Sequence, residues 1–213
     1  MNLATHIKDH PDDDLIQEKM GRQAWPQLAF LGADGSVLVK QAERSVAGFT
    51  KTLDGLTTQA DLAKKAAAGD KTAAADLLIA EIASEKLDLE TATKKVKEAK
   101  LDAEQAKKAQ AALTDLEVAS QLKLVANPRD PKRAEALAGV RKHLQAMRKE
   151  GRIPTGGRAR PFWTELLNGA KADKDAKAFQ ELLGEAKKHL PDDAATKALL
   201  DRAETDLETL KSH

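Results

Sequence analysis

The chain has 213 residues, of which 32% are charged and 41% hydrophobic, and its formal net charge is only +1. This balance is typical of a globular protein and gives no reason to expect nucleic acid or an acidic surface as the main partner. Cysteine is absent, which excludes disulfides, thiolate metal sites and cysteine-based chemistry carried by this chain alone. No run approaches the roughly 20 apolar residues of a membrane helix. The first residues have no apolar signal-peptide core, so the chain as written is expected to be cytoplasmic.

Residues 1–56 form a first segment of mixed character. Two short apolar runs, residues 28–31 and 36–41, flank Asp34-Gly35, a dipeptide that strongly indicates a β-hairpin. The first run is apolar throughout and is expected to be a strand buried on both faces, with the second strand nearer an edge. Ser45 is expected to cap a helix that carries an apolar face made of Val46, Phe49 and Leu53.

In residues 57–213 the sequence predicts helices only, because apolar residues recur at helical spacing and Gly and Pro residues mark the connections between the helices. The expected helices are Thr58–Ala68, Thr72–Lys86, Leu89–Lys100, Asp102–Val125, Pro131–Glu150, Arg160–Ala172, Asp175–Leu190 and Ala194–Lys211. The early helices resemble an array of tetratricopeptide type, although no 34-residue consensus repeats. The predicted fold class is therefore α+β and predominantly α, with a domain at residues 1–56 and an irregular helical bundle at residues 57–213.

Residues 6–55 resemble the C-terminal half of a thioredoxin-fold domain. The order of elements is a helix, a tight Trp25-Pro26 entry, a buried strand, an Asp-Gly hairpin, a second strand and a closing helix. In that family a cis proline precedes the strand and lies beside the redox CxxC motif, and Pro26 matches its position. The helical remainder resembles the C-terminal extension of some bacterial thioredoxin-like proteins.

The resemblance implies the fold, but this chain departs from the family in its chemistry. The strands and the CxxC-bearing helix of the family would lie upstream of Leu3, and the chain has no cysteine. We therefore expect a non-enzymatic protein that acts in protein–protein interaction or assembly. The alternative is the C-terminal fragment of a thiol–disulfide oxidoreductase or chaperone whose CxxC portion lies upstream of Met1.

An incomplete sheet also suggests a partner, because a strand without a neighbour exposes backbone hydrogen-bonding groups. A second copy of the chain, the chain's own helices or another protein could cover this edge. We expect a homodimer formed through the incomplete sheet. No cofactor and no membrane contact are expected.

Two pairs of residues near the N-terminus are candidate sites. His6 and His10 stand four residues apart among aspartates, but Pro11 interrupts them and no third ligand is well placed, so a surface or capping role is favoured over metal binding. Trp25 and Pro26 could face an extended peptide, or they could serve as a turn and core anchor. No combination of residues indicates a catalytic site.

The segment from Pro128 to Arg160 is strongly basic. A basic helix followed by the glycine-containing turn PTGG could contact an acidic protein or phosphates, or its charges could be solvated or paired within the chain. Nucleic acid is the least favoured of these, because aromatic side chains are not interleaved. The candidate contacts for an acidic partner are Arg141, Arg148, Lys149, Arg152 and Arg158.

Overall fold

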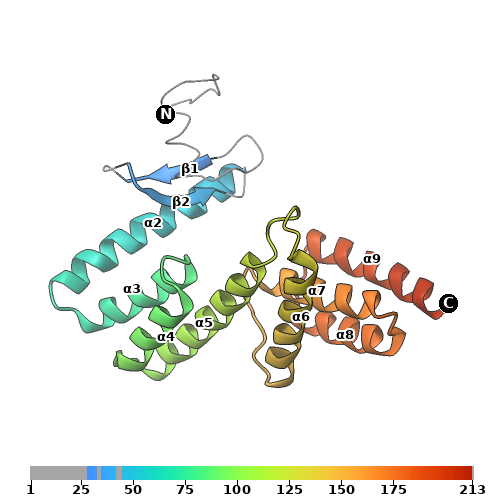
Figure 1. Ribbon diagram of the computed structural model, residues 1–213. Coiled ribbons are helices and arrows are strands. Elements are labelled where there is room, and N and C mark those ends of the chain that lie inside the picture. The colour runs from blue at the N-terminus through green and yellow to red at the C-terminus, as the bar shows by residue number, and fades with distance from the viewer. Residues whose placement is uncertain (1–27, 33–34, 42–44, 213) are drawn as a thin grey trace. The chain divides into compact units, whose positions relative to one another are not determined.

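The structure is a computed structural model that describes residues 28–32, 35–41 and 45–212, with the backbone alone at residues 40 and 41. The described residues are mainly helical and include one two-stranded antiparallel sheet, which confirms the predicted predominantly α, α+β class (Figure 1). The chain separates into two compact units, Met1–Asp70 and Lys71–His213, which we call unit 1 and unit 2. Within the described ranges, no helix combines the length and the apolar character needed to cross a membrane.

The sheet of unit 1 consists of β1 (Leu28–Leu31) and β2 (Val37–Gln41), which confirms the predicted hairpin. Phe30 pairs with Val39, and a bulge follows between Phe30 and Leu31. Gly35 has a positive φ of 76°, the conformation for which glycine is preferred in hairpin turns. The expectation that β1 is buried on both faces is wrong: its first three residues are half-buried and Leu31 is 58% exposed, because the hairpin and α2 do not enclose the strand.

The closing helix of unit 1, α2 (Val46–Ala67), begins at the predicted cap, where Ser45 Oγ accepts a hydrogen bond of 3.0 Å from the Gly48 N–H. The separate helix predicted at Thr58–Ala68 is wrong, because α2 continues through Gly55 to Ala67 as one helix. A glycine inside a helix costs only about 1 kcal/mol relative to alanine. The hydroxyls of Thr57 and Thr58 bond back to carbonyls one turn earlier and do not end the helix. The boundary expected between residues 56 and 57 falls inside α2.

Unit 2 begins with three helices around a small apolar cluster. They are α3 (Lys71–Ala83), α4 (Leu89–Glu98) and α5 (Ala103–Lys123). Asp88 caps α4 and Asp102 caps α5, the latter in a capping box with Gln105. The cluster is made by Ile82, Ala92, Ala112, Leu113 and Leu116.

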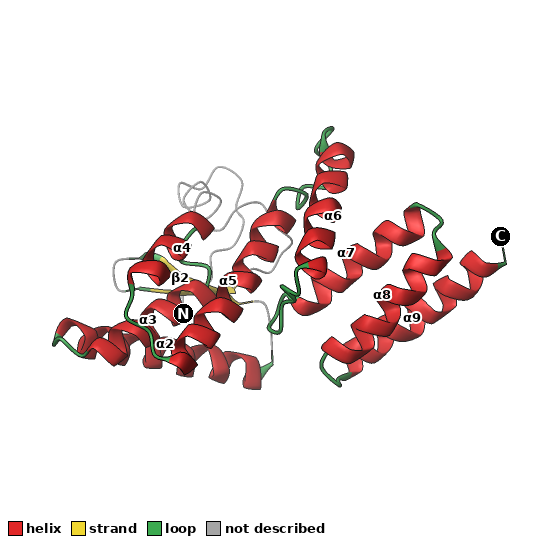
Figure 2. Cartoon of the chain, turned by 90° about the horizontal axis from the view of Figure 1, so that it is seen from below, coloured by secondary structure: helices red, strands yellow, loops and turns green. Residues whose placement is uncertain are grey.

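Four further helices build most of the larger apolar cluster of unit 2, which also includes Val118 of α5. They are α6 (Arg133–Lys149), α7 (Ala159–Ala172), α8 (Ala176–His189) and α9 (Ala194–Lys211). Figure 2 shows α7, α8 and α9 lying side by side. Four residues of α7 are buried in this cluster: Phe162, Trp163, Leu166 and Leu167.

The centre of the larger cluster is Trp163, which is fully buried. Its ring meets Phe162 edge-on at 5.3 Å and stacks on His189 at 5.8 Å. The indole Nε1 has no hydrogen-bond partner among the described residues. Trp163 therefore contributes through packing and burial.

Candidate interaction site

The basic segment predicted to meet an acidic partner is held by carboxylates of the same unit. Arg148 on α6 makes a bidentate pair with Glu185 on α8, with Nε–Oε2 at 2.7 Å and Nη2–Oε1 at 2.6 Å. These hydrogen bonds raise the pKa of Arg148 and lower the pKa of Glu185. Both groups are therefore charged over the whole physiological range.

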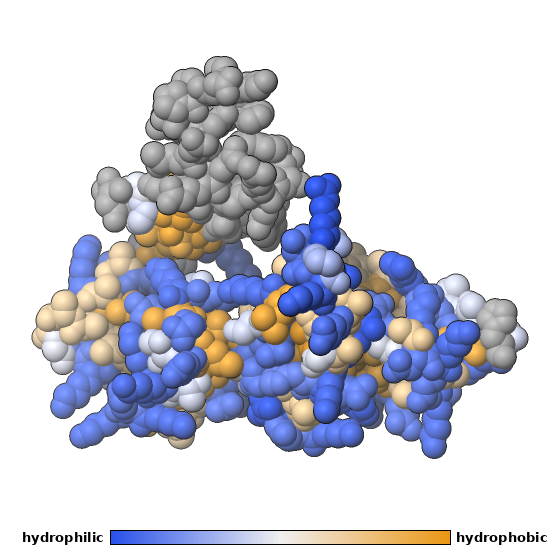
Figure 3. Space-filling model, viewed as in Figure 1, coloured by the Kyte–Doolittle hydropathy of each residue, from blue (hydrophilic) through white to orange (hydrophobic). Residues whose placement is uncertain are grey.

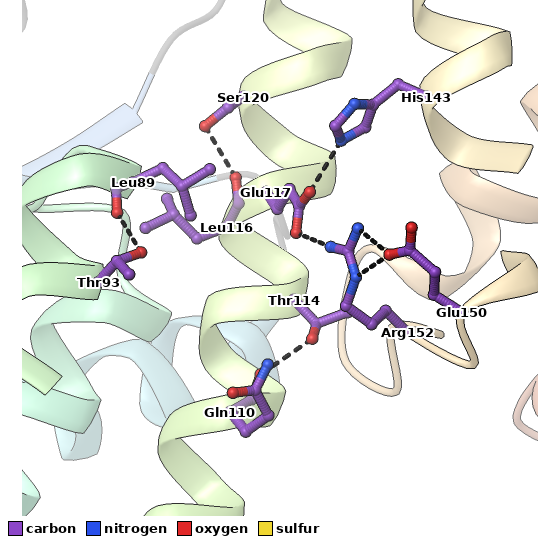
Figure 4. A network of polar contacts seen from close by, with 10 residues as sticks. All are labelled: Leu89, Thr93, Gln110, Thr114, Leu116, Glu117, Ser120, His143, Glu150 and Arg152. Carbon is purple, nitrogen blue, oxygen red and sulfur yellow. Dashed lines mark hydrogen bonds and ion pairs between the residues drawn. The ribbon is translucent and has the colours of Figure 1, made fainter. Parts of the chain in front are cut away.

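A second arginine is the centre of the network shown in Figure 4. Arg152 donates to Glu117 on α5 and to Glu150, where the Nε–Oε2 distance is 2.9 Å. Its hydrogen bond to Glu117 is the largest contribution to the raised pKa of Arg152. The other oxygen of Glu117 lies 2.8 Å from Nε2 of His143 on α6. The carboxylate of Glu117 thus connects α5 to α6 and to the segment that follows α6.

A third arginine, Arg158, pairs with Glu85, which also lies 3.0 Å from Lys123 Nζ. Glu85 follows α3 with a positive φ of 56°, and its N–H bonds to the Ile82 carbonyl at 3.0 Å as the helix closes. Burial opposes ionisation of Glu85, but the hydrogen bonds from Arg158 and Lys123 outweigh it and lower its pKa.

Two further arginines of the segment reach other parts of unit 2. Arg141 lies 3.5 Å from Glu165 on α7, and Arg160 lies 2.8 Å from Asp193, the N-cap of α9. Of the five predicted partner contacts, Lys149 is exposed and makes no ion pair within the described residues. The other four would have to leave a carboxylate of this chain before they could meet one on a partner.

The PTGG turn closes a small cavity of about 220 Å³ beside Glu85 and Arg158. Asp115 on α5 lines this cavity, and burial raises the pKa of its carboxyl group. The Gly156 N–H donates to Asp115 Oδ1 at 3.4 Å. A Cβ at Gly156 would overlap Asp115 Oδ2, so any larger residue here would force the carboxyl group to move. This carboxyl group fastens the turn to α5.

His6, His10, Trp25 and Pro26 lie outside the described residues. Within the described ranges, no group of three or more His, Asp or Glu side chains is arranged to hold a metal ion.

Exposed apolar side chains gather in unit 1. Of the five large hydrophobic residues that are exposed in the described part of the chain, four lie between β1 and the middle of α2. They are Leu31 (58% exposed), Leu38 (36%), Val46 (85%) and Leu53 (54%), whereas the fifth, Leu124, lies in unit 2. In Figure 3, a hydrophobic patch is visible near the strands, and further hydrophobic patches lie among the largely hydrophilic surface of unit 2.

Comparison of the chain with protein-family models, with curated proteins and with solved structures gives no match. The likeness to thioredoxin-fold and tetratricopeptide proteins therefore stays a prediction from the sequence. The exposed apolar side chains of unit 1 are the feature of the described residues that most resembles a binding surface.

Proposed function

We propose that this protein acts without catalysis, in protein–protein interaction or assembly, as a thioredoxin-like βα segment followed by a tetratricopeptide-like helical array. The observation that supports this proposal is the concentration of exposed Leu and Val side chains in unit 1. Single exposed hydrophobic residues are ordinary, but four of them within one short stretch of unit 1 favour a contact role for this unit. The internal pairing of the arginines favours unit 1 over the basic segment.

The proposal is tested with the full chain carrying a fluorescent label at nanomolar concentration in an extract of the source cells. We expect the labelled chain to sediment faster in the extract than the 23.0 kDa chain does in buffer. The double variant Leu31→Lys/Leu53→Lys should lose this shift, because charged side chains in the surface oppose burial.

The matched control is Leu124→Lys, which places the same charge on an exposed leucine of unit 2 and should keep the shift. Equal sedimentation in extract and in buffer would contradict the proposal, and so would a shift that the double variant retains. Circular dichroism of each variant checks that helicity is unchanged.

The second candidate is the C-terminal part of a thiol–disulfide oxidoreductase or chaperone. One observation favours it: β1, β2 and α2 follow one another as an antiparallel hairpin and a helix, the order that closes a thioredoxin fold. Translating the genomic sequence upstream of Met1 in frame tests this candidate. A strand followed by a CxxC-bearing helix would support it, and the longer chain should then reduce insulin while the present chain, which has no thiol, should not.

A further inference from the structure

The helices of unit 2 pack in two groups. The helices α3 and α4 pack on α5 and on each other around the smaller cluster, whereas α7 packs on α6, α8 and α9 around the larger one. We call α3–α5 the first helix group and α6–α9 the second helix group. The two groups meet where α6 lies against α5. The angle between the groups therefore depends on what holds this junction.

The apolar part of the junction lies at the end of α5. Val118 and, just beyond the helix, Val125 are buried in the larger cluster, and Leu122 packs against it. Arg133, at the start of α6, donates to the Val125 carbonyl at 3.1 Å, and the connection between them, residues 126–132, is exposed. Because apolar contacts are non-directional, these residues can stay packed as a pivot while the angle between the groups changes.

The junction also has a polar part, which is made by residues 152–158 between α6 and α7. We call this segment the latch. Three of its residues bond to carboxylates of the first helix group, and two of these carboxylates lie on α5 while the third follows α3. The pairs are Arg152 with Glu117, the Gly156 N–H with Asp115, and Arg158 with Glu85. His143 on α6 reaches the same carboxylate as Arg152, with its Nε2 2.8 Å from Glu117 Oε1 (Figure 4).

The two ends of the latch are held differently. Near its beginning Pro154 is fully buried and Ile153 packs against the larger cluster, which anchors the latch in the second helix group. Residues 155–157 are exposed, and Gly157 lines the cavity of about 220 Å³ together with Leu116 of the first group. Because a cavity rather than close-packed side chains lies here, this end can leave the first group with little loss of apolar packing.

We propose that residues 152–158 form an ionic latch that sets the angle between the two helix groups, and that release of the latch lets the groups turn about the pivot at the end of α5. The side chains of its two ion pairs are between 17% and 38% exposed. Ion pairs with such exposure contribute modestly and are weakened by salt, so the latch opens while both clusters stay folded. The inference does not depend on the proposed function, which rests on unit 1.

The absence of cysteine allows the angle to be measured with two spin labels on the full chain. Lys95→Cys on α4 and Lys197→Cys on α9 place the labels at exposed positions of the two groups. Double electron–electron resonance at low salt should give one narrow distance distribution. Adding Glu85→Gln and Glu117→Gln should widen it, with the ratio of turned to latched molecules rising about 2- to 30-fold, the range expected when two partly exposed ion pairs are lost.

The matched control is Glu185→Gln in the same labelled chain. It removes an arginine–carboxylate pair of similar exposure that lies within the second group, and it should leave the distance distribution unchanged. An equal widening in this control would overturn the inference.

Salt provides a second measurement that needs no change in the latch. About 1 M NaCl, where the Debye length is about 3 Å, should widen the distribution of the labelled chain with an intact latch and add little to that of the Glu85→Gln/Glu117→Gln variant. Circular dichroism checks that the variant keeps its helicity, and if it does not, the effect of salt on the intact latch decides alone. A distribution that stays narrow in high salt and in the folded variant would show that these ion pairs do not set the angle.

Discussion

Units 1 and 2 distribute their apolar side chains in opposite ways. In unit 2 the large hydrophobic residues are mostly buried, in two clusters, and arginine–carboxylate pairs join the helices around them. In the described residues of unit 1 the single buried residue is Gly48, and four large hydrophobic side chains are exposed. The described part of unit 1, a two-stranded sheet and one helix, buries too little surface to be stable by itself. Unit 2 therefore has the character of a self-sufficient domain, whereas the described part of unit 1 depends on further contacts.

The largest expected difference between the units comes from shortening a hydrophobic side chain in each. Trp163→Ala removes the centre of the larger cluster and should lower the free energy of unfolding by about 3–5 kcal/mol. Leu53→Ala, at an exposed position of α2, should change it by less than about 0.5 kcal/mol. Urea unfolding followed by circular dichroism measures both, and equal losses would refute the contrast.

Trp163→Phe is the matched control for the first of these changes. Because the indole Nε1 has no partner among the described residues, phenylalanine loses volume but no hydrogen bond. The loss of stability should therefore be clearly smaller than that of Trp163→Ala. A loss as large as that of alanine would mean that the indole N–H contributes to stability.

A smaller loss of stability is expected at Gly156, where the backbone of the turn lies close to the side chain of Asp115. Gly156→Ala places a Cβ against Asp115 Oδ2 and should lower the free energy of unfolding by about 1–2 kcal/mol, because the carboxyl group must move and its hydrogen bond to the turn is lost. Gly157→Ala, where a Cβ would meet nothing within 4 Å, is the control and should cost little. Urea unfolding of both variants decides the question, and equal costs would show that the Asp115 contact does not hold the turn.

The smallest expected effect concerns the ion pair of Arg148 with Glu185. Because the folded-state pKa of Glu185 is lowered from 4.5, the pair stabilises unit 2 above about pH 4.5, and this stabilisation is lost as the pH falls through the lowered value. Glu185→Gln should lower the free energy of unfolding at pH 7 by about 1 kcal/mol or less, since the pair is partly exposed. Urea unfolding from pH 7 to pH 3 should show the variant and the unmodified chain converging at low pH. A constant difference across this range would exclude an ionic contribution.

The sequence predicts most helix boundaries because their signals are local. Asp88 and Asp102 cap α4 and α5 where a helix start was expected, and the buried face of α7 follows from the spacing of Phe162 and Trp163. The continuity of α2 through Gly55 was missed, because a glycine among threonines indicates an end as strongly as it indicates a tolerated interior residue.

The contacts of the basic segment could not be predicted in the same way. Arg158 and Glu85 are 73 residues apart, and Gly156 and Asp115 are 41 apart. Local spacing contains no information about such pairs, and in so charged a sequence every arginine has many candidate partners. The exposure of Leu53 was equally hidden, because its spacing predicts an apolar face but not what covers it.

The position of α5 has a consequence for synthesis on the ribosome. This helix gives Leu113 and Leu116 to the smaller cluster and Val118 to the larger one. Because chains emerge and fold from the N-terminus, the smaller cluster can close once α5 has emerged. Val118, which is fully buried in the finished protein, then stays exposed until α6, α7 and α8 have been synthesised. During that interval the growing chain displays an apolar surface that a chaperone can bind, and slower translation of residues 124–190 would prolong it.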